Sequence, residues 1–201
     1  MTLKEIAYDW LGWNEQLFFF INAGLPDGLR TIPLLGSALG NYWAAPLPFA
    51  ALLWWSRRAP DERWRRRAER QAYVFAASFL LAFAVAALVK WNLDLPRPAT
   101  VLGPSVRLLA PEEAGHGFPS GHTLYAALLG AAVWPLAGRT GRFALILWVL
   151  WVAYSRIALG AHFPADVAGG LLLALLVAWA AGHAWDRLWS VRGEARVPSA
   201  S

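Results

Sequence analysis

A short polar stretch between two long apolar runs carries three ionisable side chains, Arg156, His162 and Asp166. Ionisable groups this close to apolar segments are costly, so they indicate a functional site. If a helix starts near Pro164, Asp166 lies in its first turn and can point back at His162. A carboxylate that fixes one ring nitrogen leaves the other free to act as a base or nucleophile. The plainer alternative is a histidine at a helix end, followed by an aspartate that suits the helix dipole.

A second cluster runs from Lys90 to Pro98 and holds two cations, Lys90 and Arg97. Pro96 and Pro98 flank the arginine, and they restrict the backbone and so limit where its guanidinium can point. Two cations in such a segment could bind an anion. Either cation alone could instead be an anchor that reaches from a helix end to a membrane interface.

A third cluster, Pro119-Ser120-Gly121-His122, opens another apolar run. A helix that begins here would offer free backbone N–H groups and a positive dipole end, which together bind an oxyanion. Gly121 lets that backbone approach a ligand closely, Ser120 can donate a hydrogen bond, and His122 lies in the first turn. The alternative is an ordinary serine-capped helix with an interfacial histidine.

Together the clusters supply three cations, a helix N-terminus, two histidines and one carboxylate. Phosphoryl transfer without a metal needs such a set, because positioned donors must hold the charge on three phosphoryl oxygens. Arginine does this with a planar fork of donors. One histidine can attack phosphorus while the second protonates the leaving oxygen.

Composition places the chain among membrane proteins. Of its 201 residues 58% are hydrophobic and 15% are charged, and its mean hydropathy is +0.39. This balance is too apolar for a soluble domain, and the length suits one domain of five or six spans at about 20 residues each. The absence of cysteine excludes disulfides and thiolate chemistry. The net charge of +5 is clustered, and no basic module interleaved with aromatic residues suggests a nucleic-acid partner.

The apolar runs predict an all-α bundle of about six transmembrane helices, five clear and the first one short. The first run could instead form an interfacial helix, and Pro46 and Pro48 should kink the second. A polar break with seven arginines, 57–70, precedes the third run, and the five prolines of 91–119 argue against a helix there. The expected spans contain the apolar runs 17–22, 31–56, 71–89, 123–137, 143–155 and 167–185.

The placement of basic residues predicts the orientation. With six spans, one side of the membrane holds 13 of the 18 Lys and Arg residues, and the positive-inside rule makes that side cytoplasmic. Both termini are then cytoplasmic, and 91–119 and 155–166 share the outer side. Five spans would move the N-terminus but leave these two segments outside. The 13 residues are Lys4, the seven arginines of 57–70, Arg139, Arg142, Arg187, Arg192 and Arg196.

In order and spacing, the three clusters resemble the three-part signature of the type 2 phosphatidic acid phosphatase superfamily, the lipid phosphate phosphatases. Six residues separate Lys90 from Arg97-Pro98, and Pro119-Ser120-Gly121-His122 follows. Next comes Ser155-Arg156, with five residues to His162 and three more to Asp166. Residue types and spacing match at every signature position, in the centre and second half of the chain. A three-part match in order is more specific than one short motif.

The resemblance implies a role for each signature residue. His162 would be the nucleophile and form a phosphohistidine, Asp166 would orient it, and His122 would protonate the leaving group. Water would then hydrolyse the phosphohistidine, with no metal and no cofactor. The implied phosphate-binding residues are Lys90, Arg97, Ser120, Gly121 and Arg156. We expect one transmembrane phosphatase domain, 1–190, with its catalytic core at about 71–187 and a polar tail at 191–201.

The resemblance also implies a membrane lipid phosphate as substrate, in the cell inner membrane. An outward-facing site favours undecaprenyl diphosphate, released outside the cytoplasm as the polyprenyl carrier is used. Phosphatidylglycerol phosphate, phosphatidic acid and the lipid A phosphates are alternatives. The superfamily also includes vanadium haloperoxidases, but those are soluble, whereas this chain has charge-free runs. A non-hydrolytic carrier of phosphorylated lipid is a rival of another class, although a carrier has no need for two histidines around an anion site.

Overall fold

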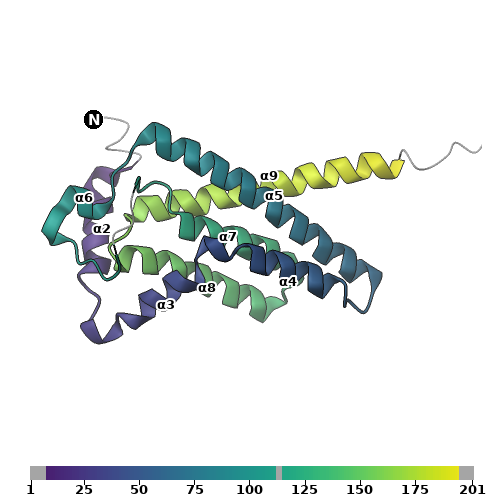
Figure 1. Ribbon diagram of the computed structural model, residues 1–201, viewed down its shortest axis with the longest axis horizontal. Helices are drawn as coiled ribbons and strands as arrows, with labels where there is room; N and C mark the ends of the chain where they lie inside the picture. The colour runs from purple at the N-terminus through teal and green to yellow at the C-terminus, as the bar shows by residue number, and fades with distance from the viewer. Residues whose placement is uncertain (1–7, 112–114, 195–201) are drawn as a thin grey trace, which may run out of the picture.

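The computed structural model describes residues 8–111 and 115–194, and within them every regular element is a helix. This confirms the expected all-α class. The long helices run roughly along the long axis of the molecule, and the shorter α2 and α6 lie at one end (Figure 1). The α-helices, in order along the chain, are α2 (Trp13–Asn22), α3 (Thr31–Leu39), α4 (Pro46–Ser56), α5 (Glu62–Leu93), α6 (Pro98–Leu102), α7 (Gly121–Val133), α8 (Arg139–Ala158) and α9 (Pro164–Glu194).

The central helix of the bundle is α7, which packs against α5, α8 and α9. Leu124 and Leu128 are almost fully buried, as are the alanines beside them. A helix that is apolar on all sides is surrounded either by other helices or by lipid, and α7 is surrounded by helices. The hydrophobic core therefore holds the N-terminus of α7, with the third sequence cluster, in a fixed place relative to α5 and α9.

Three segments are long and apolar enough to cross a membrane, within the ranges that the structure describes. They are Glu62–Ser105, which contains α5, then Arg139–Ala158 and Pro164–Trp189. Their outer surfaces expose large apolar side chains such as Leu80, which is 71% exposed, as expected of helices that face lipid. Three qualifying segments are fewer than the six expected spans, so the span count stays a prediction.

The first expected span is short, as the sequence predicts. The 17–22 run lies in α2, whose 10 residues rise about 15 Å, half of a bilayer core of about 30 Å. The structure thus favours the interfacial alternative for this helix. The second expected span, 31–56, is not one kinked helix but two, α3 and α4, with a 3-10 turn at Tyr42–Ala44 between them. Pro46 takes the first position of α4, where no backbone N–H is needed.

The arginine-rich break at 57–70 is shorter than expected, because α5 begins at Glu62. Asp61 caps this helix by accepting the backbone N–H of Trp64 at 2.7 Å. Glu62 then pairs with Arg65 and Arg66, one turn further along. Five of the seven arginines therefore lie on the helix rather than in a loop.

Two other boundaries differ from expectation. The proline-rich segment 91–119 does contain a helix, α6, because Pro98 again serves as a first helical residue. Helix α9 continues to Glu194, so the expected tail boundary at 191 falls inside it. Residues 195–201 of that tail lie outside the described residues, as do Lys4 and Arg196 of the charge count.

Candidate active site

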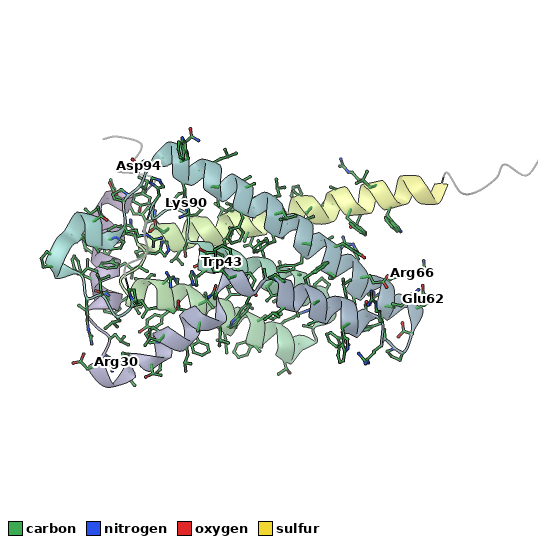
Figure 2. The ribbon with its side chains drawn as sticks, viewed as in Figure 1. Arg30, Trp43, Glu62, Arg66, Lys90 and Asp94 are labelled. Atoms are coloured by element: carbon green, nitrogen blue, oxygen red, sulfur yellow. The ribbon has the colours of Figure 1, made fainter. Side chains whose placement is uncertain are left out.

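Four helix ends meet at one end of the bundle and bring the three sequence clusters together. They are the C-terminal ends of α5 and α8 and the N-terminal ends of α7 and α9. Figure 2 shows Lys90 and Asp94 at this end, and Glu62 and Arg66 at the other. The candidate site and the arginine-rich start of α5 thus lie at opposite ends of the molecule.

His162, in the turn between α8 and α9, forms a hydrogen-bonded pair with Asp166, in the first turn of α9. Gly160 has a φ of +79°, a left-handed conformation that ends α8 and starts the turn. His162 Nδ1 lies 3.2 Å from Asp166 Oδ2, and the same oxygen accepts the backbone N–H of Phe163 at 2.9 Å. Asp166 therefore does point back from the first turn of a helix that begins at Pro164.

Burial controls the charge of His162, which is only 1% exposed. Removal from water lowers the pKa of His162 to about 4, although its hydrogen bond to Asp166 acts in the opposite direction. The ring is then neutral near pH 7. With Nδ1–H donated to the carboxylate, the Nε2 lone pair is left for chemistry.

Of the two cations in the second cluster, Arg97 lies beside that nitrogen and Lys90 lines the same cavity. Arg97 is 7% exposed, and its Nη1 lies 3.3 Å from His162 Nε2 and donates to the carbonyl of Ala161 at 2.9 Å. Its Nε donates to the Gly115 carbonyl at 3.1 Å, and Lys90 Nζ donates to the His116 carbonyl at 2.8 Å. An arginine this buried is not an interface anchor. Both cations point inward toward one loop.

A cavity of about 330 Å³ collects most of the predicted residues. Phe83 and two alanines of α5, with Tyr42 from the turn before α4, give it an apolar wall beside the cationic side chains. The predicted residues that line it are Lys90, Arg97, Gly121, His122 and His162. The others that line it are Tyr42, Phe83, Ala86, Ala87, Gly115 and His116.

Three predicted residues do not line this cavity but lie behind it. Asp166 contacts His162, and the backbone N–H of Ser120 donates to the Asp166 carbonyl at 2.9 Å. Arg156 is 3% exposed, and its Nη1 donates to Ser37 Oγ at 2.6 Å. The structure thus gives Ser120 and Arg156 contacts that position the site, and their direct phosphate contacts stay predictions.

The loop that contains Ser120 and leads into α7, called the Ser120 loop below, approaches α9 closely. It contains a cis peptide bond between Phe118 and Pro119, and α7 starts directly after Ser120. A Cβ on Gly170 would lie 2.6 Å from the Ser120 carbonyl oxygen. A glycine in α9 therefore lets the loop sit against the helix that carries Asp166.

The N-terminal segment also contributes to the site, which the sequence did not predict. The Tyr8 hydroxyl donates to Asp166 Oδ1 at 2.8 Å, and Asn14 Oδ1 accepts the backbone N–H of Ala165 at 2.9 Å. Burial, reinforced by the Asp166 charge, raises the pKa of Tyr8, so its hydroxyl keeps its proton. The only sequence signal was polar residues within a mainly apolar segment, which does not reveal a partner some 150 positions away.

These contacts also bear on the side of the membrane expected for the N-terminal segment, which is described from Tyr8 onward. Tyr8 lies at the site end, whereas α9 runs away from that end toward Glu194 (Figure 1). The N-terminal segment and the end of α9 therefore do not share the side opposite the site, as two cytoplasmic termini would require. The arrangement resembles the five-span alternative in this respect.

Comparison with known proteins identifies the family. Residues 71–190, more than half of the chain, match the PAP2 superfamily. The chain belongs to the PAP2 superfamily. The matched range contains all three clusters, which confirms the resemblance drawn from their spacing.

Three relatives support this assignment. An undecaprenyl-diphosphatase of Sulfolobus acidocaldarius is 28% identical over 164 residues, 81% of this chain and 74% of that protein. The crystal structure of LpxE from Aquifex aeolicus matches with a TM-score of 0.73 and 23% identity, over 84% of this chain and 94% of the other. A transmembrane PAP2 type phosphatidylglycerolphosphate phosphatase from Bacillus subtilis matches with a TM-score of 0.71 and 18% identity, over 90% of this chain and 88% of the other. At such identities the two structures show a shared fold.

Family membership and the long apolar helices together make this chain a membrane lipid phosphatase. The soluble haloperoxidase alternative does not fit those helices. The site has the donors that phosphoryl transfer requires, because a neutral imidazole, two cations and a second imidazole line one cavity.

Proposed function

We propose that this chain hydrolyses undecaprenyl diphosphate to undecaprenyl phosphate and inorganic phosphate through a phosphohistidine at His162. The observation that carries the proposal is the cavity that brings His162, His122, Lys90 and Arg97 together, with Asp166 behind His162. The Sulfolobus relative, an undecaprenyl-diphosphatase that aligns with most of the chain, supports this substrate.

The terminal phosphate binds between the cations and the start of α7. Lys90 and Arg97 are already oriented by their hydrogen bonds to backbone carbonyls, so holding a phosphate needs little rearrangement. The backbone at Gly121 adds a helix N-terminus. This cradle neutralises the phosphoryl oxygens, which otherwise repel a nucleophile.

His162 attacks through Nε2, because Asp166 holds the proton on Nδ1. A P–N bond forms to the terminal phosphorus, and the P–O bond to undecaprenyl phosphate breaks. His122 donates a proton to the leaving oxygen. Water then attacks phosphorus while His122 takes up a proton, and the P–N bond breaks to release inorganic phosphate.

The apolar wall of the cavity supports a lipid substrate. Phe83 and Ala86 lie on its wall, together with Ala87, which is exposed on the outer surface of α5. A phosphate bound at Lys90 can therefore carry a hydrocarbon chain that extends toward the bilayer. A small soluble phosphate ester would leave this wall unused.

The site faces the extracytoplasmic side of the cell inner membrane in our proposal. The arginines of 57–70 and those at the start of α8 lie at the end of the bundle opposite the site, which supports this orientation through the positive-inside rule. Undecaprenyl diphosphate arises on that side, so the orientation and the substrate agree.

Two alternatives have specific support. The fold shared with the Bacillus subtilis enzyme favours phosphatidylglycerol phosphate as a second substrate, with phosphatidic acid and lipid A phosphates behind it. A carrier that binds phosphorylated lipid without hydrolysis would use the same cations. The carboxylate-backed His162 argues against it, because binding alone needs no nucleophile.

A phosphate-release panel tests the proposal. Purified protein in detergent with EDTA is given undecaprenyl diphosphate, phosphatidylglycerol phosphate, phosphatidic acid or lipid A, and rates per enzyme are compared. We expect the diphosphate to be fastest, His162→Ala to be inactive, and EDTA to have no effect. A faster rate on another lipid would identify that lipid as the substrate instead. Loss of activity on chelation would overturn the metal-free mechanism. Binding without release would favour the carrier.

A further inference from the structure

The buried carboxylate of Asp166 has two oxygens with separate partners. Oδ2 accepts from His162 and from the Phe163 backbone, whereas Oδ1 accepts from the hydroxyl of Tyr8 at 2.8 Å. Asp166 is 0% exposed, so water does not replace a lost partner cheaply. The Tyr8 hydroxyl is thus the donor that the structure records for Oδ1.

The ring of Tyr8 also joins two catalytic segments. It contacts Phe118 edge-on, with ring centroids 5.9 Å apart, and Phe163 in the same way at 6.5 Å. Phe118 precedes the loop that leads to His122, and Phe163 directly follows His162. The hydroxyl therefore reaches Asp166 from a ring that is fixed on two sides.

We propose that Tyr8 is a positioning residue for the phosphatase reaction, because its hydroxyl holds Asp166 in the geometry that orients His162. This inference rests on the proposed nucleophilic role of His162. Tyr8 does not line the cavity, so it acts through Asp166 and not on the substrate.

The hydrogen bond has a defined effect on the nucleophile. By taking part of the carboxylate charge, Tyr8 limits how strongly Asp166 attracts the proton on His162 Nδ1. That proton stays on the ring during attack, while the new P–N bond forms at Nε2 and the P–O bond to the leaving group breaks. Tyr8 keeps its own proton throughout.

Removal of the hydroxyl should make the pair more basic. With one donor fewer, the Asp166 charge is less well satisfied, and it stabilises protonated His162 more strongly. The charged groups that act on this pair are Arg97 from the loop after α5 and Arg156 from α8, with Asp9 beside Tyr8. Tyr8→Phe changes none of them. His122, on the cavity wall, is also unchanged.

Tyr8→Phe is the test, and Tyr154→Phe, in α8, is the matched control. We expect kcat on the best lipid of the panel to fall about tenfold, the size expected for one hydrogen bond to a charged group. KM should stay the same, and the acid limb of kcat/KM should move to higher pH. The control should match the wild type. Unchanged kcat would overturn the proposal. A lower kcat with an unmoved acid limb would show a merely structural role and would overturn it too.

Histidine NMR in detergent separates this inference from the proposed function. The His162 resonance is assigned with a His162→Gln variant and titrated in the wild type and in Tyr8→Phe, without substrate. A higher His162 pKa in Tyr8→Phe supports the contact, even if no lipid of the panel is hydrolysed. An unchanged pKa overturns the positioning role, even if the enzyme is active.

Discussion

At the residue scale, the buried His162 imidazole should set the acid limit of activity. An attacking imidazole must be unprotonated, and burial lowers the pKa of His162 to about 4 from an ordinary value of 6.5. Protonation therefore begins only well below neutral pH. We expect kcat/KM to stay level down to about pH 5 and to fall as the pH drops through about 4. Rates of phosphate release in detergent between pH 3 and 8 measure this. A fall centred near 6.5 would mean that His162 is hydrated during the reaction.

The role of His122 can be separated from that of His162 by the leaving group. A phosphate leaving group, as in a diphosphate, needs less protonation than the alkoxide that leaves from phosphatidic acid. We expect His122→Asn to slow the diphosphate about 10²-fold, within the usual range for general acid catalysis, and to slow phosphatidic acid more. His162→Asn should stop both reactions. Equal slowing of both lipids by His122→Asn would argue against a proton donor.

Sequence spacing located five residues that line the cavity and three that lie behind it, but not the N-terminal residues that support them. Lys90, Arg97 and His162 stand in local patterns whose chemistry can be read directly. Tyr8 and Asn14 reach the same turn from more than 150 residues away. Such contacts depend on how the helices pack, and no local pattern encodes that packing.

At the element scale, the approach of the Ser120 loop to α9 should be sensitive to one methyl group. An added Cβ on Gly170 would meet the Ser120 carbonyl oxygen at 2.6 Å, which is backbone and cannot rotate away. We expect Gly170→Ala to destabilise the protein by about 1–3 kcal/mol and to lower kcat. Thermal unfolding in detergent and phosphate release measure the two effects.

Gly28→Ala is the matched control, because nothing lies within 4 Å of a Cβ at Gly28. Its melting temperature and activity should equal those of the wild type. If Gly170→Ala also behaved as the wild type, the loop would have room to shift without disturbing the site.

Helix boundaries were predicted less well than helix positions, and the reasons are local. The arginines after Asp61 were expected to lie in a polar break. Instead α5 begins among them, because Asp61 caps the helix and Glu62 forms ion pairs in its first turn. Pro46 was expected to kink a helix, but it is the first residue of α4. Charge and proline content alone do not show which residues cap a helix.

At the scale of the whole molecule, the proposed orientation can be measured directly because the chain has no cysteine. Asn92, exposed in the last turn of α5, lies at the site end, and Arg66 lies at the other end with 75% of its side chain exposed. In intact cells, a membrane-impermeant maleimide should label Asn92→Cys and not Arg66→Cys. In permeabilised cells, both variants should be labelled. The reverse pattern would place the site in the cytoplasm.

Hydropathy identified a helical membrane protein but overestimated the length of its first elements. The described helices α2, α3 and α4 have 10, 9 and 11 residues, and none of them spans a bilayer core alone. Apolar composition shows that a segment avoids water, whether it crosses the membrane or lies against other helices.

The contacts of α2 with the segment around His162 have a consequence for biogenesis. Asn14 binds the backbone of Ala165, 151 positions later, and Asn22 binds the carbonyl of Ala158. Closing such distant contacts is slow and requires most of the chain to be in place. A chain still emerging from the ribosome therefore lacks these contacts, and the proposed site is complete only once the start of the last long helix, α9, has been made.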